Sequence, residues 1–492
     1  MTTTTASSRS DPRMREAWGY RFQWTDHHQA PNQYNHLKYM CDTLAEECVT
    51  ILNEVPFSES RSEGEGEAPL RQSQSKRDLY ALFCSHHHKN DKLQQLWDQV
   101  NTIPEWVDWD QIARGQDVFY RYGEANLTGL TYQSLLGGTA SSRVTEVLAR
   151  TGGFSIKSVW RRLLETTQFI LECTNDLASI KPGGDGFASC LRVRFLHATV
   201  RQRILQIASR HPAYYSVEKC GVPVNDLDCI GTIAVFSATI IWQSLPRQGI
   251  FLRQQEILDY LALWRLVGYY MGTPTEFFST PAKAKAIMES LYCYEYTPSA
   301  MSRLHANNII WAVENTPPSY ASRSYLEANA RWLNGDKLAD ALELGRPGIY
   351  YRMLTAGQCL LLMITCYTCR AIPPLDRLRI KSFRRTVWSV LKSPDTGLES
   401  LTIFEFKYVP KFETDSKNQV AGALEDKRPK VFWTAERRIC TTLVFMAVTS
   451  LIGLWTFGKA VSWTWRMLYP GMGLGLGSGW PRLRFWNRAW TT

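Results

Sequence analysis

The sequence predicts an all-α protein, and three observations support this fold class. Apolar residues recur at steps of three and four in helix-length runs between about residue 78 and residue 395. Alternation of apolar and polar residues, the pattern of a β-strand, is scarce and short. Hydrophobic residues make up 45% of the 492 residues, and 18 Trp, 22 Tyr and 20 Phe are among them. This composition provides for a large core built from helices packed on helices.

Six segments show the helical spacing most clearly, with Gly, Pro or Asn residues separating the runs. These segments are Asp91–Asn101, Trp109–Tyr122, Ser142–Arg150, Ile156–Asn175, Ser189–Arg210 and Gln254–Met271. Together they predict a helical domain over residues 78–410.

Residues 1–77 are expected to form an N-terminal extension of this domain. The first 14 residues are polar, predict a disordered tip and lack the apolar stretch of a secretion signal. The segment Ser58–Lys76 is rich in Ser, Glu, Gly and Gln and poor in apolar residues. It is therefore predicted to be a solvated polar loop.

Residues 439–458 predict a transmembrane helix. All twenty are uncharged, and at a rise of about 1.5 Å per residue they would span the hydrocarbon core of a bilayer. The alternative is a buried helix of the globular domain. The polar linker at residues 411–438 and the Gly-rich, short basic tail at residues 459–492 favour the membrane.

The charges beside this segment predict its orientation. Basic residues are more numerous before it (Lys427, Arg428, Lys430, Arg437 and Arg438) than in the turns after it (Lys459 and Arg466). By the positive-inside rule, the large N-terminal domain should face the cytosol. The twelve cysteines are widely spread rather than arranged as a disulfide framework, which agrees with reduced thiols in a cytosolic domain.

The formal net charge of +10 raises the question of nucleic-acid binding. The arginines, however, are scattered among apolar helices, and no RNP, zinc-finger or basic-zipper pattern accompanies them. Nucleic acid is therefore not expected as a partner. A Gly-rich phosphate loop and a G-x-S-x-G elbow are also missing from the sequence, which leaves nucleotide-dependent and serine-hydrolase chemistry unsupported.

His197 occupies an unusual position in the predicted helix 189–210. Helical phase places it on the apolar stripe formed by Val193, Leu196, Val200, Ile204 and Ile207. Arg194 precedes it by three residues and Arg201 follows by four. An imidazole flanked by two guanidiniums suits haem, whose iron binds imidazole and whose propionates bind arginine. A buried core histidine beside solvated arginines remains the alternative.

Two further helices carry polar residues at helical spacing. In segment 156–175, Arg162, Glu165, Thr166 and Phe169 lie on one face, which suggests a polar pocket beside an aromatic ring. The alternative is an exposed ion pair within the helix. Glu146 lies in segment 142–150, which ends at a Gly-rich helix stop.

The order and spacing of these motifs resemble one known family, over about residues 100–390. It joins the bacterial latex clearing proteins, or rubber oxygenases, with the fungal ER-bound oxygenase of mycophenolic acid biosynthesis. The motifs are the glutamate before the Gly-rich helix end, the R-x-x-[K/E]-T helix and the R-V-R-x-x-H-A-x-V-R helix. Segments Pro104–Asp110, Arg114–Phe119, Val222–Thr232 and Leu263–Pro274 also look similar to the family.

The resemblance implies a globin-like, helical domain that binds haem b and cleaves carbon–carbon double bonds of isoprenoid chains with O2. Carried over by position, His197 would be the proximal iron ligand and Glu146 the catalytic base. Arg162 and Thr166 match the polar helix of the latex enzymes. Glu165 stands where those enzymes have lysine, so water or O2 is expected at the sixth iron site and rubber is not the expected substrate.

The predicted function is that of a membrane-anchored, haem-dependent oxygenase at the endoplasmic reticulum, with its catalytic domain in the cytosol. Its expected substrate is an apolar isoprenoid, terpenoid or related secondary-metabolite intermediate, such as a polyketide, cleaved with O2. One alternative is a haem enzyme that hydroxylates or rearranges a non-isoprenoid intermediate. Another is a membrane-anchored helical scaffold without catalysis.

Overall fold

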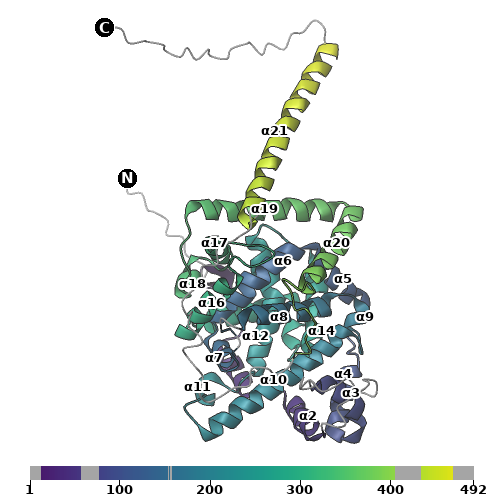
Figure 1. Cartoon of the computed structure of the whole chain (residues 1–492), viewed down its shortest axis with the longest axis vertical. Helices are drawn as coiled ribbons and strands as arrows, with labels where there is room; N and C mark the ends of the chain where they lie inside the picture. The colour runs from purple at the N-terminus through teal and green to yellow at the C-terminus, as the bar shows by residue number, and fades with distance from the viewer. Residues whose placement is uncertain (1–12, 57–76, 153, 156–157, 405–433, 469–492) are drawn as a thin grey trace, which may run out of the picture. The chain divides into compact units, whose positions relative to one another are not determined.

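Helices form nearly all the regular structure in a computed structural model of the chain, as the sequence predicts (Figure 1). The structure describes residues 13–56, 77–152, 154–155, 158–404 and 434–468. Within these ranges the strands are β1 (Met14–Ala17) and β2 (Tyr20–Gln23), an antiparallel hairpin that pairs Met14 with Gln23. Residues 1–12 of the predicted disordered tip, the polar loop and most of the predicted linker lie outside the described residues. Met14, which the sequence placed in the disordered tip, instead begins β1.

The first half of the chain contains helices α1 to α11. Their bounds are α1 Pro31–Tyr34, α2 Thr43–Glu54, α3 Leu79–His86, α4 Asp91–Asn101, α5 Trp109–Arg121, α6 Gly123–Gly129, α7 Ser142–Arg150, α8 Val159–Thr174, α9 Leu177–Ile180, α10 Asp185–Arg210 and α11 Val217–Cys220. A π-helical segment, Leu130–Leu136, follows α6.

The second half contains helices α12 to α21. Their bounds are α12 Asp226–Phe236, α13 Leu245–Arg247, α14 Gln254–Tyr270, α15 Pro281–Tyr294, α16 Ala300–Val313, α17 Arg323–Asn334, α18 Asp336–Ala341, α19 Ile349–Ala371, α20 Pro373–Leu391 and α21 Ala435–Leu468. A second π-helical segment, Ile240–Ser244, precedes α13.

The six predicted helices are present, and their ends differ from prediction by only a few residues. The bounds of α4 and α7 match the prediction, and α5 and α14 end one residue early. Helix α10 begins at Asp185, four residues before its predicted start, because Gly184 takes the extended N-cap conformation and Asp185 provides an acidic first turn.

The centre of the fold is the close contact between α5 and α14. Gly115 of α5 permits it, since a Cβ atom there would lie 2.4 Å from the carbonyl oxygen of Asp259. Large aromatic side chains of both helices, including Tyr120, Tyr260 and Trp264, are fully buried around this contact. The bidentate ion pair of Arg114 with Asp259, at 3.0 and 3.1 Å, closes one side of it.

The N-terminal residues are part of the same core. Cys48, Val49 and Leu52 of α2 belong to one buried cluster with Phe83 of α3 and Phe195 of α10. The chain divides into a first unit, Met1–Arg437, and a second unit, Arg438–Thr492. The segment expected to be an extension, residues 1–77, therefore falls within the unit that contains the helical domain, and its described part packs into the core.

Among the described residues, three helical segments are long and apolar enough to cross a membrane by length and composition. In their most apolar 18-residue windows, Asp226–Arg247 is mostly buried, Ile349–Ala371 is 28% buried, and Ala435–Trp465 has no buried residue. The last of these contains the predicted transmembrane segment 439–458. Helix α21 is longer than that prediction because helical spacing continues through the flanking charged residues.

Candidate functional site

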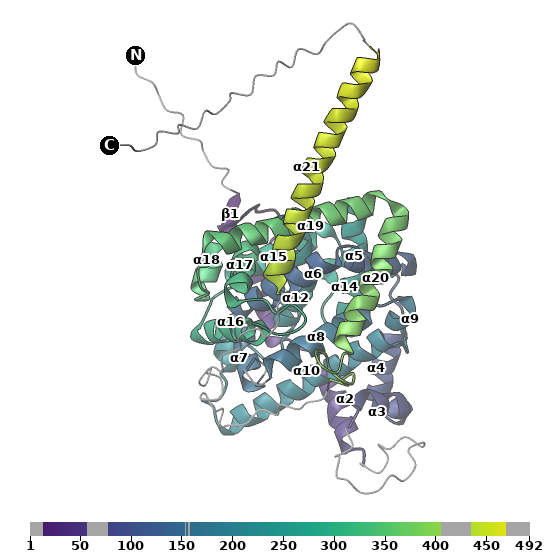
Figure 2. The same ribbon diagram turned by 45° about the horizontal axis from the view of Figure 1, so that its top comes forward.

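The predicted site residues lie on α7, α8 and α10, which are neighbours in the fold. Figures 1 and 2 show α8 lying alongside α10, and residues of these two helices are in contact. Helix α7 packs on α10 through Val147, which shares a buried cluster with Val200 and Ile204. Leu196, the neighbour of His197 in sequence, borders this cluster.

His197 carries a partly buried imidazole on α10. Burial lowers its pKa to about 4, and the nearby cations of Arg201 and Arg162 contribute to the same effect. The ring forms no hydrogen bond with any residue that the structure describes. At neutral pH it is therefore an uncharged imidazole with a free nitrogen lone pair, the form that binds iron.

Helix α8 is packed along one half and open along the other. Residues 168–174 are all buried, whereas residues 161–167 are all partly exposed. The open half includes every predicted polar residue of this helix. Residues 161–167 keep some accessible surface although α8 also contacts α10 and α16.

The polar residues of α8 bond mainly to their own helix. Thr166 donates its hydroxyl hydrogen to the carbonyl oxygen of Arg162 at 2.9 Å. Glu165 accepts a hydrogen bond from Arg161 Nε at 3.0 Å, and the Nη1 atom of Arg162 lies 4.0 Å from its carboxylate. The guanidinium of Arg162 also lies close enough to His197 to lower the pKa of the imidazole. Arg162 thus links the polar face of α8 to the histidine of α10.

Phe169 lies in the packed half of α8, outside the partly exposed residues 161–167. Its ring is buried edge-on against Phe404, with 6.3 Å between the ring centroids. The one-face pattern predicted a pocket wall at Phe169, but the residues after Thr167 face the core.

Glu146 of α7 is held by an ion pair. Arg150 Nη1 lies 2.5 Å from its carboxylate. Arg150 also donates to the carbonyl oxygen of Tyr214 at 2.7 Å, and its guanidinium lies over the rings of Tyr214 and Tyr215. These contacts fix the glutamate in the middle of α7, one residue before the side chain that packs on α10.

Arg194 and Arg201 bind carboxylates of the chain itself. Arg194 is buried, with its Nε atom 2.5 Å from Asp42, and Arg201 Nη1 lies 3.0 Å from Glu46. Arg201 also donates to the carbonyl oxygens of Pro223 and Val224. Both guanidiniums are therefore neutralised by α2 and tie it to α10. Sequence spacing suggested haem propionates as their partners, and it missed Asp42 and Glu46 as the carboxylates that they contact.

His305 of α16 is a further histidine that sequence analysis did not select. It is 1% exposed, burial lowers its pKa to about 4, and its ring lies against Phe154. Helix α16 contacts both α7 and α8. A cavity of about 320 Å3 opens nearby, between Trp160 of α8 and Trp311 of α16. A lone histidine in an apolar helix gives no sequence signal that would distinguish it from an ordinary core residue.

Among the described residues, no group of three or more His, Cys, Asp or Glu side chains could hold a metal ion. A cofactor that brings its own equatorial ligands needs only one such side chain.

Residues 120–358 match the sequence model of one family, described as "ER-bound oxygenase mpaB/B'/Rubber oxygenase, catalytic domain". The matched range includes Glu146, Arg162, Glu165, Thr166 and His197. A search of curated proteins finds no match.

A solved structure of latex clearing protein LCP in the closed state has a similar fold. Its TM-score is 0.53 at 16% sequence identity, and the alignment covers 71% of this chain and 91% of that one. The similarity in structure supports the all-α fold over most of the first unit.

Proposed function

Residues 120–358 belong to the family of mpaB-type ER-bound oxygenases and rubber oxygenases, and from this membership we propose that the chain is a haem-dependent oxygenase. In this proposal haem b binds between α8 and α10, with His197 as its iron ligand. The observation that carries the proposal is the uncharged imidazole of His197, free of hydrogen bonds, beside the open half of α8.

Haem bound at this position would supply the binding and activation of O2. The chain supplies the surroundings. Arg162 and Thr166 place a cation and a hydroxyl group on the open half of α8, where they would orient O2 or the substrate. Position 165 is a glutamate that pairs with Arg161, so no lysine at this position competes for the iron.

Glu146 is the proposed base. Its carboxylate would accept a proton from the carbon next to the double bond of the substrate. Arg150 Nη1 lies 2.5 Å from that carboxylate, so the substrate would have to displace this ion pair to reach the base. Leu196, partly buried at the edge of the apolar cluster of Val147, Val200 and Ile204, would offer an isoprenoid-like chain an apolar contact.

The proposed location is a membrane, with α21 as a single-pass anchor. Ala435–Trp465 is 31 residues long, and its most apolar 18-residue window has no buried residue. Basic residues before the helix favour a cytosolic first unit by the positive-inside rule. An anchor of this kind would hold the site near substrates dissolved in the bilayer, and the family description points to the endoplasmic reticulum.

Absorption spectra of the detergent-solubilised full chain, before and after reduction, test the haem proposal. We expect a Soret band that is lost in the His197→Ala variant. His36→Ala is the matched control, since His36 is an exposed histidine of the N-terminal region. Circular dichroism of both variants verifies that they fold. A full Soret band in folded His197→Ala would overturn the assignment of the ligand.

The reaction is tested by product analysis with labelled O2 and isoprenoid substrates. Cleavage of a double bond places one labelled oxygen atom in each of two carbonyl products. A single labelled oxygen in one uncleaved product would instead identify a hydroxylase of the same family. A haem-loaded protein without any turnover would favour a binding role.

A further inference from the structure

Helix α19 has an apolar stripe on its exposed side. Ile349, Met353, Leu360 and Ile364 recur at steps of four and seven, and their exposed fractions are 72%, 68%, 50% and 42%. Residues 353–369 contain no charged side chain. The opposite side of the helix is buried by Leu354, Cys359, Leu362, Cys366 and Cys369. The helix is therefore apolar on both sides, and the protein covers only one of them.

The apolar surface continues around the corner between α19 and α20. Ile372, Leu375 and Leu378 are exposed there. Phe251, also exposed, adjoins the end of α19, because its backbone N–H donates to Tyr367 and its carbonyl oxygen accepts from Arg370. Contiguous exposed apolar surface of this extent marks an interaction site in a folded protein.

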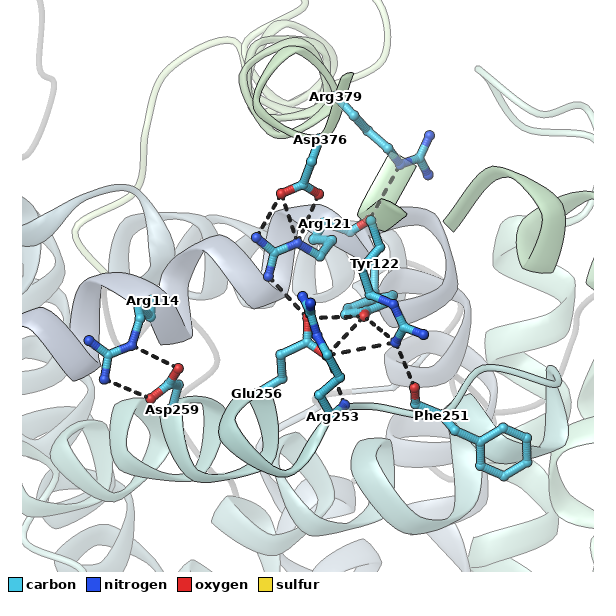
Figure 3. Close-up of polar contacts among 10 residues, drawn as sticks. Arg114, Arg121, Tyr122, Phe251, Arg253, Glu256, Asp259, Asp376 and Arg379 are labelled. Atoms are coloured by element: carbon cyan, nitrogen blue, oxygen red, sulfur yellow. Dashed lines mark hydrogen bonds and ion pairs between the residues drawn. The ribbon is translucent and has the colours of Figure 1, made fainter. Parts of the chain in front are cut away.

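A buried ionic network fixes the orientation of this corner (Figure 3). Arg121 of α5 makes three hydrogen bonds of 2.7–3.0 Å to Asp376 of α20. Arg370 of α19 donates to the hydroxyl oxygen of Tyr122 at 3.1 Å, and that hydroxyl group donates in turn to Glu256. Both helices are thus held by polar contacts on their inner side, which leaves the apolar side chains turned outward.

Basic residues stand at both ends of the stripe. Arg346 and Arg352 are exposed near the start of α19. Arg377, Lys381 and Arg385 are exposed on α20, beyond the corner. An apolar band with cations at its borders is complementary to a bilayer surface, where acyl chains meet anionic headgroups.

The start of α21 lies near α19 within the first unit. Glu436 is buried and accepts a hydrogen bond from the backbone N–H of Ser322 at 2.7 Å. One turn further along α17, the hydroxyl group of Tyr325 donates to Gln358 of α19. Glu436, among the last residues of the first unit, is thus linked through α17 to α19.

We propose that the outer face of α19, together with the α19–α20 corner, lies on the lipid bilayer. We call this surface the α19 face. It is formed by Ile349, Met353, Leu360, Ile364, Ile372, Leu375 and Leu378. It inserts at the level where headgroups meet acyl chains and gives the first unit a second contact with the membrane. The inference rests on the proposed anchoring by α21 and is independent of the haem chemistry.

Photo-cross-linking of the full chain in vesicles of phosphatidylcholine and phosphatidylserine tests this proposal. The photoreactive residue p-benzoylphenylalanine replaces Leu360 in one variant and Met353 in another. Gln206, exposed on α10, is the control position outside the α19 face. Leu451, exposed in α21, tests the anchor itself. After irradiation, mass spectrometry identifies what each position has captured.

We expect lipid adducts at positions 353, 360 and 451 and none at position 206. Lipid at 451 without lipid at 353 and 360 would overturn the α19 face and leave the anchor intact. Capture of a second chain at position 360 would identify the face as a dimer interface and also overturn the proposal. Lipid at none of these positions would overturn the anchor together with the inference.

The charged border gives a second test. In the variant Arg377→Gln/Lys381→Gln/Arg385→Gln, the lipid adduct at position 360 should lose its dependence on the phosphatidylserine content. The adduct at position 451 should be unchanged, because α21 needs no such cations. Equal dependence on phosphatidylserine with and without the three cations would contradict the role of these charges.

Discussion

Arg162 of α8 lies close enough to His197 of α10 for its guanidinium to lower the pKa of the imidazole. We expect Arg162→Gln to raise that pKa from about 4, because one of the nearby cations is removed. Burial and Arg201 remain, so the pKa should stay below its ordinary value of 6.5. NMR titration of the His197 ring in haem-free protein measures the shift.

Arg161→Gln is the matched control for this experiment. Arg161 precedes Arg162 on the same helix and pairs with Glu165, but it is not among the charges that shift His197. An equal rise of the His197 pKa in both variants would show that the effect comes from α8 as a whole. Turnover should fall in Arg162→Gln while the Soret band is retained, because in the proposed site Arg162 orients the reactants and does not bind the iron.

The buried pair of Arg194 and Asp42 predicts a stability change. Asp42→Asn should lower the free energy of unfolding by about 3 kcal/mol, because it leaves a guanidinium buried without its counter-charge. Asparagine still caps α2, so the loss reports mainly on the ion pair. Adding Arg194→Met should recover part of it. Denaturant unfolding measures Asp42→Asn, the single Arg194→Met variant and the double variant.

The same Arg194→Met variant decides whether this arginine also contacts a cofactor. Since its guanidinium is bound to Asp42, we expect the haem content of the variant to match that of the wild type. Loss of haem from a folded variant would restore the role that the sequence spacing suggested.

His305 predicts a pH dependence of stability. Its pKa is about 4 in the folded protein against 6.5 for an ordinary histidine, so the unfolded chain binds more protons between these values. Stability contributed by the neutral ring is complete above about pH 6.5 and is lost as the pH falls toward 4. The loss amounts to about 3 kcal/mol at most. His305→Gln should show a smaller decline than wild type between pH 6.5 and 5, whatever its stability at neutral pH.

Gly115 predicts a packing defect. In Gly115→Ala the new methyl group would lie 2.4 Å from a backbone oxygen of α14, so the two helices must move apart. We expect the free energy of unfolding to fall by about 1–3 kcal/mol. Gly348→Ala, where no atom lies within 4 Å of the added Cβ, is the control and should change stability little.

Local pattern predicted those features that depend on neighbours in sequence. The bounds of α4 and α7 follow from spacing and caps, and helical phase placed Val200, Ile204 and Ile207 on one apolar stripe, which is buried with Val147 of α7. The partners of Arg194 and Arg201 could not be found in this way, because Asp42 and Glu46 lie more than 150 positions away in the chain. Likewise, α19 shows a continuous apolar run in sequence, and only the packing of α17 and α20 separates its covered side from its exposed one.

The division of α8 into a packed half and an open half has a consequence for the stability of the protein in the cell. A cofactor that fills the space beside residues 161–167 would add its binding free energy to the stability of the folded chain, by linkage. Newly made chains without cofactor would open first at this helix and be recognised there by proteases and chaperones. The amount of the protein in a cell should therefore follow the supply of its cofactor.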